Sequence, residues 1–370
     1  MLQDFFQSYL AAYQPFKSYW NYEDGCVLQG CRTLYAVTDV ACYRDFIMHY
    51  LDGRVAGDGS VPSFLQGQYC LDSFQCSKAL FFADAIAPHG KFARALRHHR
   101  EYLRQHPRTQ SGLLWHKGIY PQQVWLDGMY MLMPFLAEYA VWSATDAASC
   151  IEEIRRAFAF VRKNMCDLKT GLYRHGMDEA RVQPWADPQT GLSASCWLRG
   201  TGWLLMALVD CIGLLSDVDA PLQSELIAML RQSVQALLPY RSESGLFYHV
   251  IHAPALEGNY TETSGNAMIA YTLLRGGVMG VLSPEQAEIG ARMLECLCDQ
   301  KCVRQLGGFV LGDICRSAGL GGATHRDGSG AYYCSEPRVQ NDPKGVGALM
   351  MAHAALLQWR QMNLSARSVG

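Results

Sequence analysis

The sequence carries little charge and almost no charge imbalance. Only 18% of its 370 residues are charged, and 32 basic against 34 acidic residues leave a formal net charge of −2. Proteins that bind nucleic acid usually present a basic face, so we expect no nucleic-acid partner. Apolar runs such as Trp203 to Val209 are far shorter than the roughly 20 residues that span a bilayer. The first residues include Asp4 and no basic leader, so we expect a cytoplasmic protein with no membrane partner.

The cysteines lack the spacing of a metal site. There are fourteen, yet no Cys-x-x-Cys pair occurs, so we expect reduced thiols packed as small hydrophobic groups. The sequence also lacks the motifs Gly-x-x-x-x-Gly-Lys-Ser/Thr, Gly-x-Ser-x-Gly and His-Glu-x-x-His. We therefore expect neither a metal nor a cofactor.

Apolar residues, by contrast, are abundant and periodic. They make up 49% of the chain, which is enough for a large core and argues against disorder. They recur at steps of three and four residues, as in helices, and no run alternates like a strand. The helical stretches are 77–85, 129–140, 151–161, 204–215, 222–238 and 347–359. Since no linker divides the sequence, we predict a single domain over residues 1–370.

A short motif of the form Gly-Leu-x-x-His recurs at Gly112, Gly171 and Gly245, and Gly307 begins a degenerate fourth copy. Each interval accommodates two helices and their loops, which is typical of repeated supersecondary units. Helical hairpins that close on themselves form an α/α toroid, and loops between them gather at one end. The motif therefore predicts a toroid with a site built from loops at that end, although an open solenoid fits the repeat as well.

Two aspartates stand in unusual surroundings. Asp127 lies between Trp125 and Gly128 and begins an apolar helix, and Asp72 precedes another helical stretch beside Ser73. Each carboxylate is also consistent with a helix cap. If the two lie close together they repel, so one keeps its proton near neutral pH. A protonated carboxylic acid beside an ionised one is suited to proton transfer to a sugar.

Other candidates for a site that binds a charged sugar surround this pair. Arg199 offers a two-pronged partner for a carboxylate, and Trp197 and Trp203 offer apolar planes for a sugar face. His116 and His175 end two copies of the repeated motif. The remaining candidates are Lys117, which would assist with an anion, and Tyr22.

In this order along the chain, the motifs resemble those of glycoside hydrolase family 105, the unsaturated rhamnogalacturonyl hydrolases. Single pieces are weakly specific, whereas the ordered set is strongly specific and covers nearly the whole sequence. The matching segments are Trp20–Gly25, Leu71–Ser73, Trp115–Lys117, Val124–Tyr130, Gly171–Glu179, Trp197–Trp203, Glu262–Ser264 and Asn341–Gly347.

The resemblance implies an all-α (α/α)6 barrel and an unsaturated oligosaccharide substrate. It implies that the protein hydrates the double bond of a 4,5-unsaturated uronic acid at the non-reducing end of pectin (rhamnogalacturonan) fragments. Asp127 matches the family's catalytic acid/base and Asp72 its partner carboxylate. The matches for residues that line the sugar site are His116, Lys117, His175, Trp197, Arg199 and Trp203.

Two departures from the family pattern leave undetermined which sugar adjoins the unsaturated uronic acid, because Met177 and Thr201 stand where the family often has Trp and Asn.

An unsaturated glucuronyl hydrolase acting on glycosaminoglycan fragments is an alternative, although sulfated substrates favour more basic residues. A sugar epimerase on the same toroid would depend on the histidines. A non-catalytic carbohydrate-binding scaffold would need Arg199 and the aromatics but neither aspartate. We expect a monomer or a weak homo-oligomer.

Overall fold

Helices alternate between an outer and an inner layer along the whole chain. The computed structural model describes residues 1–64, 68–88, 90–305, 308–323 and 326–369. The outer helices are α1 (Leu2–Ala11), α3 (Ala41–Asp52), α6 (Lys91–Arg104), α8 (Ala147–Asn164), α10 (Ala220–Leu237) and α12 (Pro284–Lys301). The inner helices are α2 (Tyr22–Thr38), α4 (Ser73–Ser77) with α5 (Ala79–Ile86), α7 (Leu126–Trp142), α9 (Leu198–Leu214), α11 (Thr263–Val278) and α14 (Pro343–Val369).

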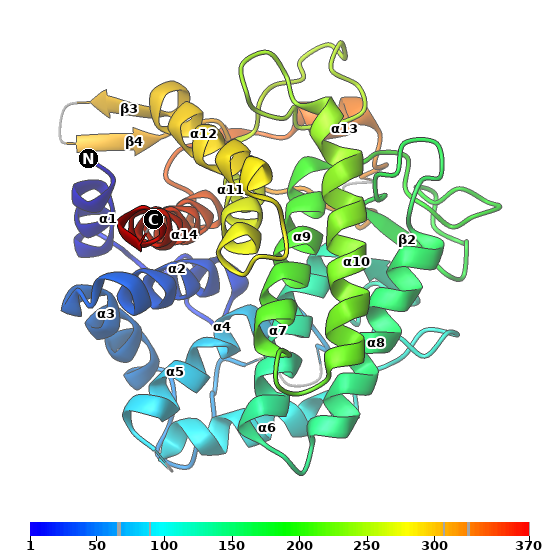
Figure 1. Ribbon diagram of the computed structural model, residues 1–370. Coiled ribbons are helices and arrows are strands. Elements are labelled where there is room, and N and C mark those ends of the chain that lie inside the picture. Colours follow the sequence, from blue (N-terminus) through cyan, green and yellow to red (C-terminus); the bar gives the residue numbers. More distant parts are fainter. Residues whose placement is uncertain (65–67, 89, 306–307, 324–325, 370) are drawn as a thin grey trace.

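The inner helices form a closed ring. In order, α2, α4, α7, α9, α11 and α14 each contact the next, and α14 returns to α2 (Figure 1). This closure confirms the predicted (α/α)6 barrel and excludes the open solenoid. The predicted helical stretches fall within these helices, except that Lys78 separates α4 from α5, Leu215 follows α9 and Leu238 begins a 3₁₀ turn, η1 (Leu238–Tyr240).

Glycines let neighbouring inner helices approach closely. A Cβ atom on Gly347 of α14 would lie 2.3 Å from the backbone oxygen of Cys26 on α2. A Cβ atom on Gly25 of α2 would lie 2.6 Å from the backbone nitrogen of Cys76 on α4. Such distances leave no room for a side chain, so glycine sets the spacing on both sides of α2.

The strands are short, and all form two-stranded antiparallel pairs within the described residues. β1 (Gln123–Trp125) pairs with β2 (Gly176–Asp178), β3 (Cys302–Gln305) with β4 (Gly308–Leu311), and β5 (Ile314–Cys315) with β6 (Arg338–Val339). The β1–β2 pair joins the loops that precede α7 and α9. A short helix, α13 (Gly330–Ser335), lies in the long connection between α12 and α14.

The repeated motif has a common structure in three of its copies. Each glycine has a positive φ (82° at Gly112, 71° at Gly171 and 84° at Gly245), and each lies in the loop that leads from an outer helix to an inner one. The fourth copy begins at Gly307, outside the described residues. No helix in the described part of the chain is long and apolar enough to cross a membrane.

Candidate active site

The candidate residues lie at the amino-terminal ends of the inner helices. Tyr22 is the first residue of α2, Asp72 directly precedes α4, and Asp127 and Arg199 are the second residues of α7 and α9. The inner helices begin at the same end of the ring because each is separated from the next by one outer helix. The positive ends of their dipoles therefore gather where these side chains lie, which favours a negatively charged ligand.

The repeated histidines fix these helix ends through their backbone. In each copy the histidine carbonyl accepts a hydrogen bond from the amide of a leucine at, or just before, the start of the preceding inner helix. The bonds run from Leu71 N to His116 O (3.1 Å), from Leu126 N to His175 O (3.0 Å) and from Leu198 N to His249 O (2.9 Å). The motif thus ties each loop to the neighbouring hairpin and places the histidine ring beside that hairpin's first turn.

Asp72 is an ion-pair partner and does not act as a helix cap. Its side chain makes no capping hydrogen bond to α4; one carboxylate oxygen lies 2.5 Å from Lys117 Nζ and the other lies 3.7 Å from His116 Nε2. Burial opposes the charge on Lys117, but Asp72 outweighs it and the pKa of Lys117 is raised. Burial lowers the pKa of His116 to about 4, so this ring is neutral near pH 7.

Asp127 ends a buried hydrogen-bonded chain of three side chains. Its Oδ2 lies 2.8 Å from His175 Nε2, and His175 Nδ1 lies 2.6 Å from the Tyr333 hydroxyl. His175 and Tyr333 are fully buried, whereas the Asp127 side chain keeps 16% of its surface exposed. Within the described residues, the Asp127 side chain forms its hydrogen bond with His175 and none with the backbone of α7. The chain therefore has one end open to a ligand and the other end inside the protein.

The expected sharing of a proton between the two aspartates does not describe Asp127. Burial raises its pKa, but the neighbouring His175, which also forms a hydrogen bond to it, and Arg199 outweigh burial, and the pKa of Asp127 is lowered from its usual value. Asp127 is thus ionised near neutral pH in this arrangement. The expectation was wrong because it assumed a bare pair of carboxylates, whereas Asp72 has Lys117 and Asp127 has His175 as a partner.

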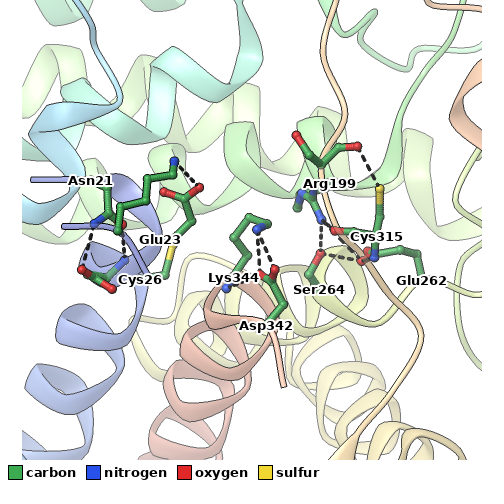
Figure 2. A network of polar contacts seen from close by, with 12 residues as sticks. Asn21, Glu23, Cys26, Arg199, Glu262, Ser264, Cys315, Asp342 and Lys344 are labelled. Carbon is green, nitrogen blue, oxygen red and sulfur yellow. Dashed lines mark hydrogen bonds and ion pairs between the residues drawn. The ribbon is translucent and has the colours of Figure 1, made fainter. Parts of the chain in front are cut away.

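Arg199 is held by the start of α11 and by strand β5. Its Nη1 donates to Ser264 Oγ (3.2 Å) and to the Cys315 carbonyl (2.6 Å), and it lies 3.7 Å from Glu262 Oε1. Glu262 in turn accepts bonds from Ser264 Oγ (2.7 Å) and Gly265 N (2.7 Å). Figure 2 shows this network, with the separate Lys344–Asp342 ion pair at the start of α14. Glu262 therefore positions Arg199 while capping α11.

The two tryptophans lie in different places. Trp197 stacks on Tyr333 at a centroid distance of 5.6 Å and contacts the His175 ring at 4.6 Å. Trp203 lies six residues further along the chain, in the barrel interior, where it stacks on Tyr130 at 5.2 Å. The structure therefore brings Trp197 together with the Asp127 chain and places Trp203 in the core.

Tyr22 and Lys344 meet from opposite ends of the sequence. Lys344 Nζ lies 5.8 Å from the centroid of the Tyr22 ring and 2.7 Å from Asp342 Oδ1. Burial, followed by the negative charge of Glu23, raises the pKa of the Tyr22 phenol, while Arg199 acts in the opposite direction. The Tyr22 hydroxyl is thus protonated near neutral pH and within the electrostatic influence of Arg199.

Sequence reasoning missed Tyr333. It lies in the short helix α13, which has no periodic signal, and its neighbours Tyr332 and Cys334 give no motif. It also missed that Lys17 pairs with Glu23 at 2.8 Å beside Tyr22. Within the described part of the chain, no group of three or more His, Cys, Asp or Glu side chains is placed to hold a metal ion.

One end of the closed helical barrel thus carries two aspartates, two histidines and an arginine, a set suited to binding a charged sugar and to transferring protons on it. The chain belongs to Glycosyl Hydrolase Family 88, whose sequence model matches residues 4–359. The solved glycoside hydrolase from family 105 of C. acetobutylicum ATCC 824 is 35% identical, has a TM-score of 0.89 and aligns over 97% of this chain and 98% of that one. This likeness confirms the predicted resemblance to family 105.

Two further relatives are more distant. The unsaturated rhamnogalacturonyl hydrolase YesR of Bacillus subtilis (strain 168) is 24% identical over 264 residues, which are 70% of this chain and 71% of YesR. The unsaturated glucuronyl hydrolase of Bacillus sp. GL1 is 15% identical with a TM-score of 0.61, over 92% of this chain and 86% of that one. At this identity the second relative shares the fold alone.

Proposed function

We propose that this glycoside hydrolase removes the 4,5-unsaturated uronic acid from the non-reducing end of rhamnogalacturonan oligosaccharides left by a polysaccharide lyase. The observation that carries the proposal is the partly exposed Asp127, bonded to His175 at 2.8 Å, at the same barrel end as Asp72 and Arg199. The relation to YesR favours rhamnogalacturonan as the source of the substrate.

The uronate carboxylate would be held by positive groups at the helix ends. In the described part of the structure, the protein hydrogen bonds of Arg199 all use Nη1, so Nε and Nη2 remain for a bound carboxylate. Lys117 lies beside Asp72 and gives a second cation. Tyr22 would donate its phenol hydrogen to the sugar. We assign Trp197 to the wall of the sugar site and Trp203 to its support from within the core.

Binding would supply the proton that catalysis needs. A bound uronate brings a negative charge and excludes water, and both effects raise the pKa of a neighbouring carboxyl group. Asp127, ionised in the structure, would then take up a proton and hold it towards C4 of the sugar. The hydrogen bond with His175 keeps the other side of the carboxyl group fixed during this change.

The reaction is an addition of water across C4=C5. Asp127 transfers its proton to C4, and positive charge develops at C5, shared with the ring oxygen. Water adds at C5 and gives its proton to Asp127 or to Asp72, which restores the enzyme. The hemiketal at C5 opens to a ketone, which leaves the ring oxygen as a hydroxyl group on C1. C1 is then a hemiacetal, and it collapses to an aldehyde as the neighbouring sugar leaves with its own hydroxyl group. Asp72 stabilises the developing cation.

The test follows the ultraviolet absorbance of the unsaturated uronate in lyase-digested rhamnogalacturonan. We expect the wild type to remove the signal, and Asp127→Asn to lose roughly 10²–10⁴-fold or more in rate while folding normally. The exposed Asp217→Asn is the matched control and keeps full activity. An Asp127→Asn enzyme that retains most of its turnover contradicts the assignment. Activity on glycosaminoglycan digests alone would transfer the proposal to the glucuronyl relative.

We also propose that residues 1–370 act as one catalytic domain in the cytoplasm, on imported short oligosaccharides. The ring needs both α2 and α14, so a piece that lacks either helix does not complete the barrel. Recovery of the active protein mainly from an extracellular fraction would contradict the location.

A further inference from the structure

A second charged cavity lies at the other end of the barrel. It encloses about 870 Å³ of space, part of it open to solvent, and its lining comes from α2, α7, α9, α11 and α14 and from Lys78 between α4 and α5. Arg199 and Asp210 lie three turns apart on α9, which is roughly 16 Å of helix rise. The stack of Trp203 on Tyr130 fills the barrel interior between the two ends.

The acids of this cavity already have partners. Glu138 forms a two-pronged ion pair with Arg32, in which Arg32 Nη1 lies 2.8 Å from Glu138 Oε2. Asp210 accepts a hydrogen bond of 2.6 Å from the Tyr271 hydroxyl. Burial raises the pKa of Asp210 above its usual value, so this group carries its negative charge less readily than an exposed aspartate.

The donors of the cavity are less well satisfied. Lys78 is 3% exposed, and its ammonium donates to the Tyr130 carbonyl at 3.0 Å and lies 3.6 Å from the centre of the Tyr130 ring. Arg275 makes one long bond of 3.4 Å, to Gln358. Gln29 is 7% exposed, and its amide nitrogen has no hydrogen-bond partner in the described part of the structure.

A bound anion would offset the unfavourable burial of the Lys78 charge and of the unpaired hydrogen-bond donors. No carboxylate of the described residues lies within ion-pair distance of the Lys78 ammonium, and burial lowers the pKa of Lys78 to about 7 although the charges of Asp210 and Glu138 act in the opposite direction. A bound anion adds a negative charge in direct contact with the ammonium and accepts the spare hydrogen bonds of the amide and the guanidinium group. Five donors on a guanidinium and three on an ammonium match the several acceptor atoms of an oxyanion.

We propose that this distal cavity binds a small oxyanion, a phosphate or a carboxylate, through Lys78, Arg275 and Gln29. The site is separate from the proposed catalytic end and does not depend on the reaction assigned there. The two ligand classes share the same acceptor chemistry, and separate titrations with inorganic phosphate and with acetate distinguish them.

Calorimetric titration of the whole protein tests the proposal. We expect saturable binding of one of the two anions by the wild type, and at least a tenfold weaker affinity in Lys78→Met. The control Lys163→Met removes an exposed lysine on α8 and leaves the affinity unchanged. At pH 8 the wild type takes up a proton on binding, so the measured heat depends on the ionisation enthalpy of the buffer.

The same titration can overturn the proposal. Absence of saturable binding for both anions, or equal affinity in wild type and Lys78→Met, contradicts it. If Lys78→Met does not fold, Arg275→Gln takes its place and is expected to weaken binding at least tenfold. An anion that binds at the catalytic end instead loses affinity in Arg199→Lys and not in the Lys78 variant, which also counts against the distal site.

Discussion

Replacing Tyr333 with phenylalanine tests the hydrogen-bonded chain behind Asp127. The change removes the hydroxyl that lies 2.6 Å from His175 Nδ1, while the ring can keep its stack on Trp197 at 5.6 Å. A neutral hydrogen bond contributes about 0.5–1.5 kcal/mol, and one to a charged group about 1.5–3 kcal/mol. The loss therefore weakens the support of the His175 ring, and with it the contact of His175 with Asp127, by about 1 kcal/mol.

This difference has a definite sign at Asp127. A weaker contact with His175 lets the pKa of Asp127 return upwards towards its usual value, by at most about one unit, because 1.36 kcal/mol corresponds to one unit. If Asp127 donates a proton, the alkaline limb of the pH–rate profile moves to higher pH. The looser imidazole also lowers the plateau rate, by about two- to tenfold.

The assay is the pH dependence of kcat for uronate hydration, measured for the wild type, Tyr333→Phe and the control Tyr332→Phe. Tyr332 is the neighbour on α13, and its hydroxyl donates to Glu336 at 2.7 Å, so its removal leaves the profile unchanged. A Tyr333→Phe profile that overlays the wild type refutes a positioning role. A loss approaching 10⁴-fold also refutes it, because Tyr333 would then itself be transferring the proton.

Three further expectations concern other parts of the molecule. Arg199→Lys raises KM about tenfold or more with a smaller change in kcat, since lysine cannot bind a carboxylate in two-pronged fashion; an unchanged KM places the uronate elsewhere. Gly347→Ala lowers the free energy of unfolding in urea by at least about 2 kcal/mol, because its Cβ would meet backbone at 2.3 Å, whereas Gly53→Ala, with no neighbour nearer than 3.8 Å, costs little. Burial lowers the pKa of His99 to about 3 in the folded protein, against about 6.5 in the unfolded chain. The folded state is therefore fully stable with respect to this group above pH 6.5, and it loses stability as the pH falls because the unfolded chain then binds a proton that the folded protein does not. Between pH 7 and pH 5 the free energy of unfolding should therefore fall by about 2 kcal/mol less in His99→Phe than in the wild type. An equal fall in both proteins would contradict the lowered pKa of His99.

Helices with a strong apolar face could be predicted from the sequence. α7, α8, α9 and α10 each show apolar residues at helical spacing, and their predicted and observed ranges overlap closely. α2 gave no such signal, although it is the centre of the ring closure. Its buried positions include Glu23, Asp24 and Gln29 as well as Gly25 and Gly30, so polar and small residues interrupt the apolar spacing of this helix.

The sequence predicted which residues belong to the candidate site, but not which of them contact one another. Asp127 stood out by its neighbours Trp125 and Gly128, Asp72 as its possible partner, and the histidines by their repeat. The partners that decide the charge of Asp127 lie far away in sequence: His175 is 48 residues later, and Tyr333 is 158 residues beyond His175. Spacing along the chain carries no information on such contacts, which depend on the closure of the barrel.

The contact between α2 and α14 also determines when the ring can fold during synthesis of the protein. α2 is synthesised before the other inner helices, but it packs against α14, which is synthesised last and contributes Gly347 to the contact. Until that last segment is synthesised, the glycine-lined side of α2 has no lasting cover, and the pairing of Tyr22 with Lys344 does not exist. Contacts between such distant segments form slowly, because a long loop must close first. Folding of the ring, and completion of its anion-attracting end, therefore waits for the synthesis of α14, and a chain that stops before α14 never reaches it.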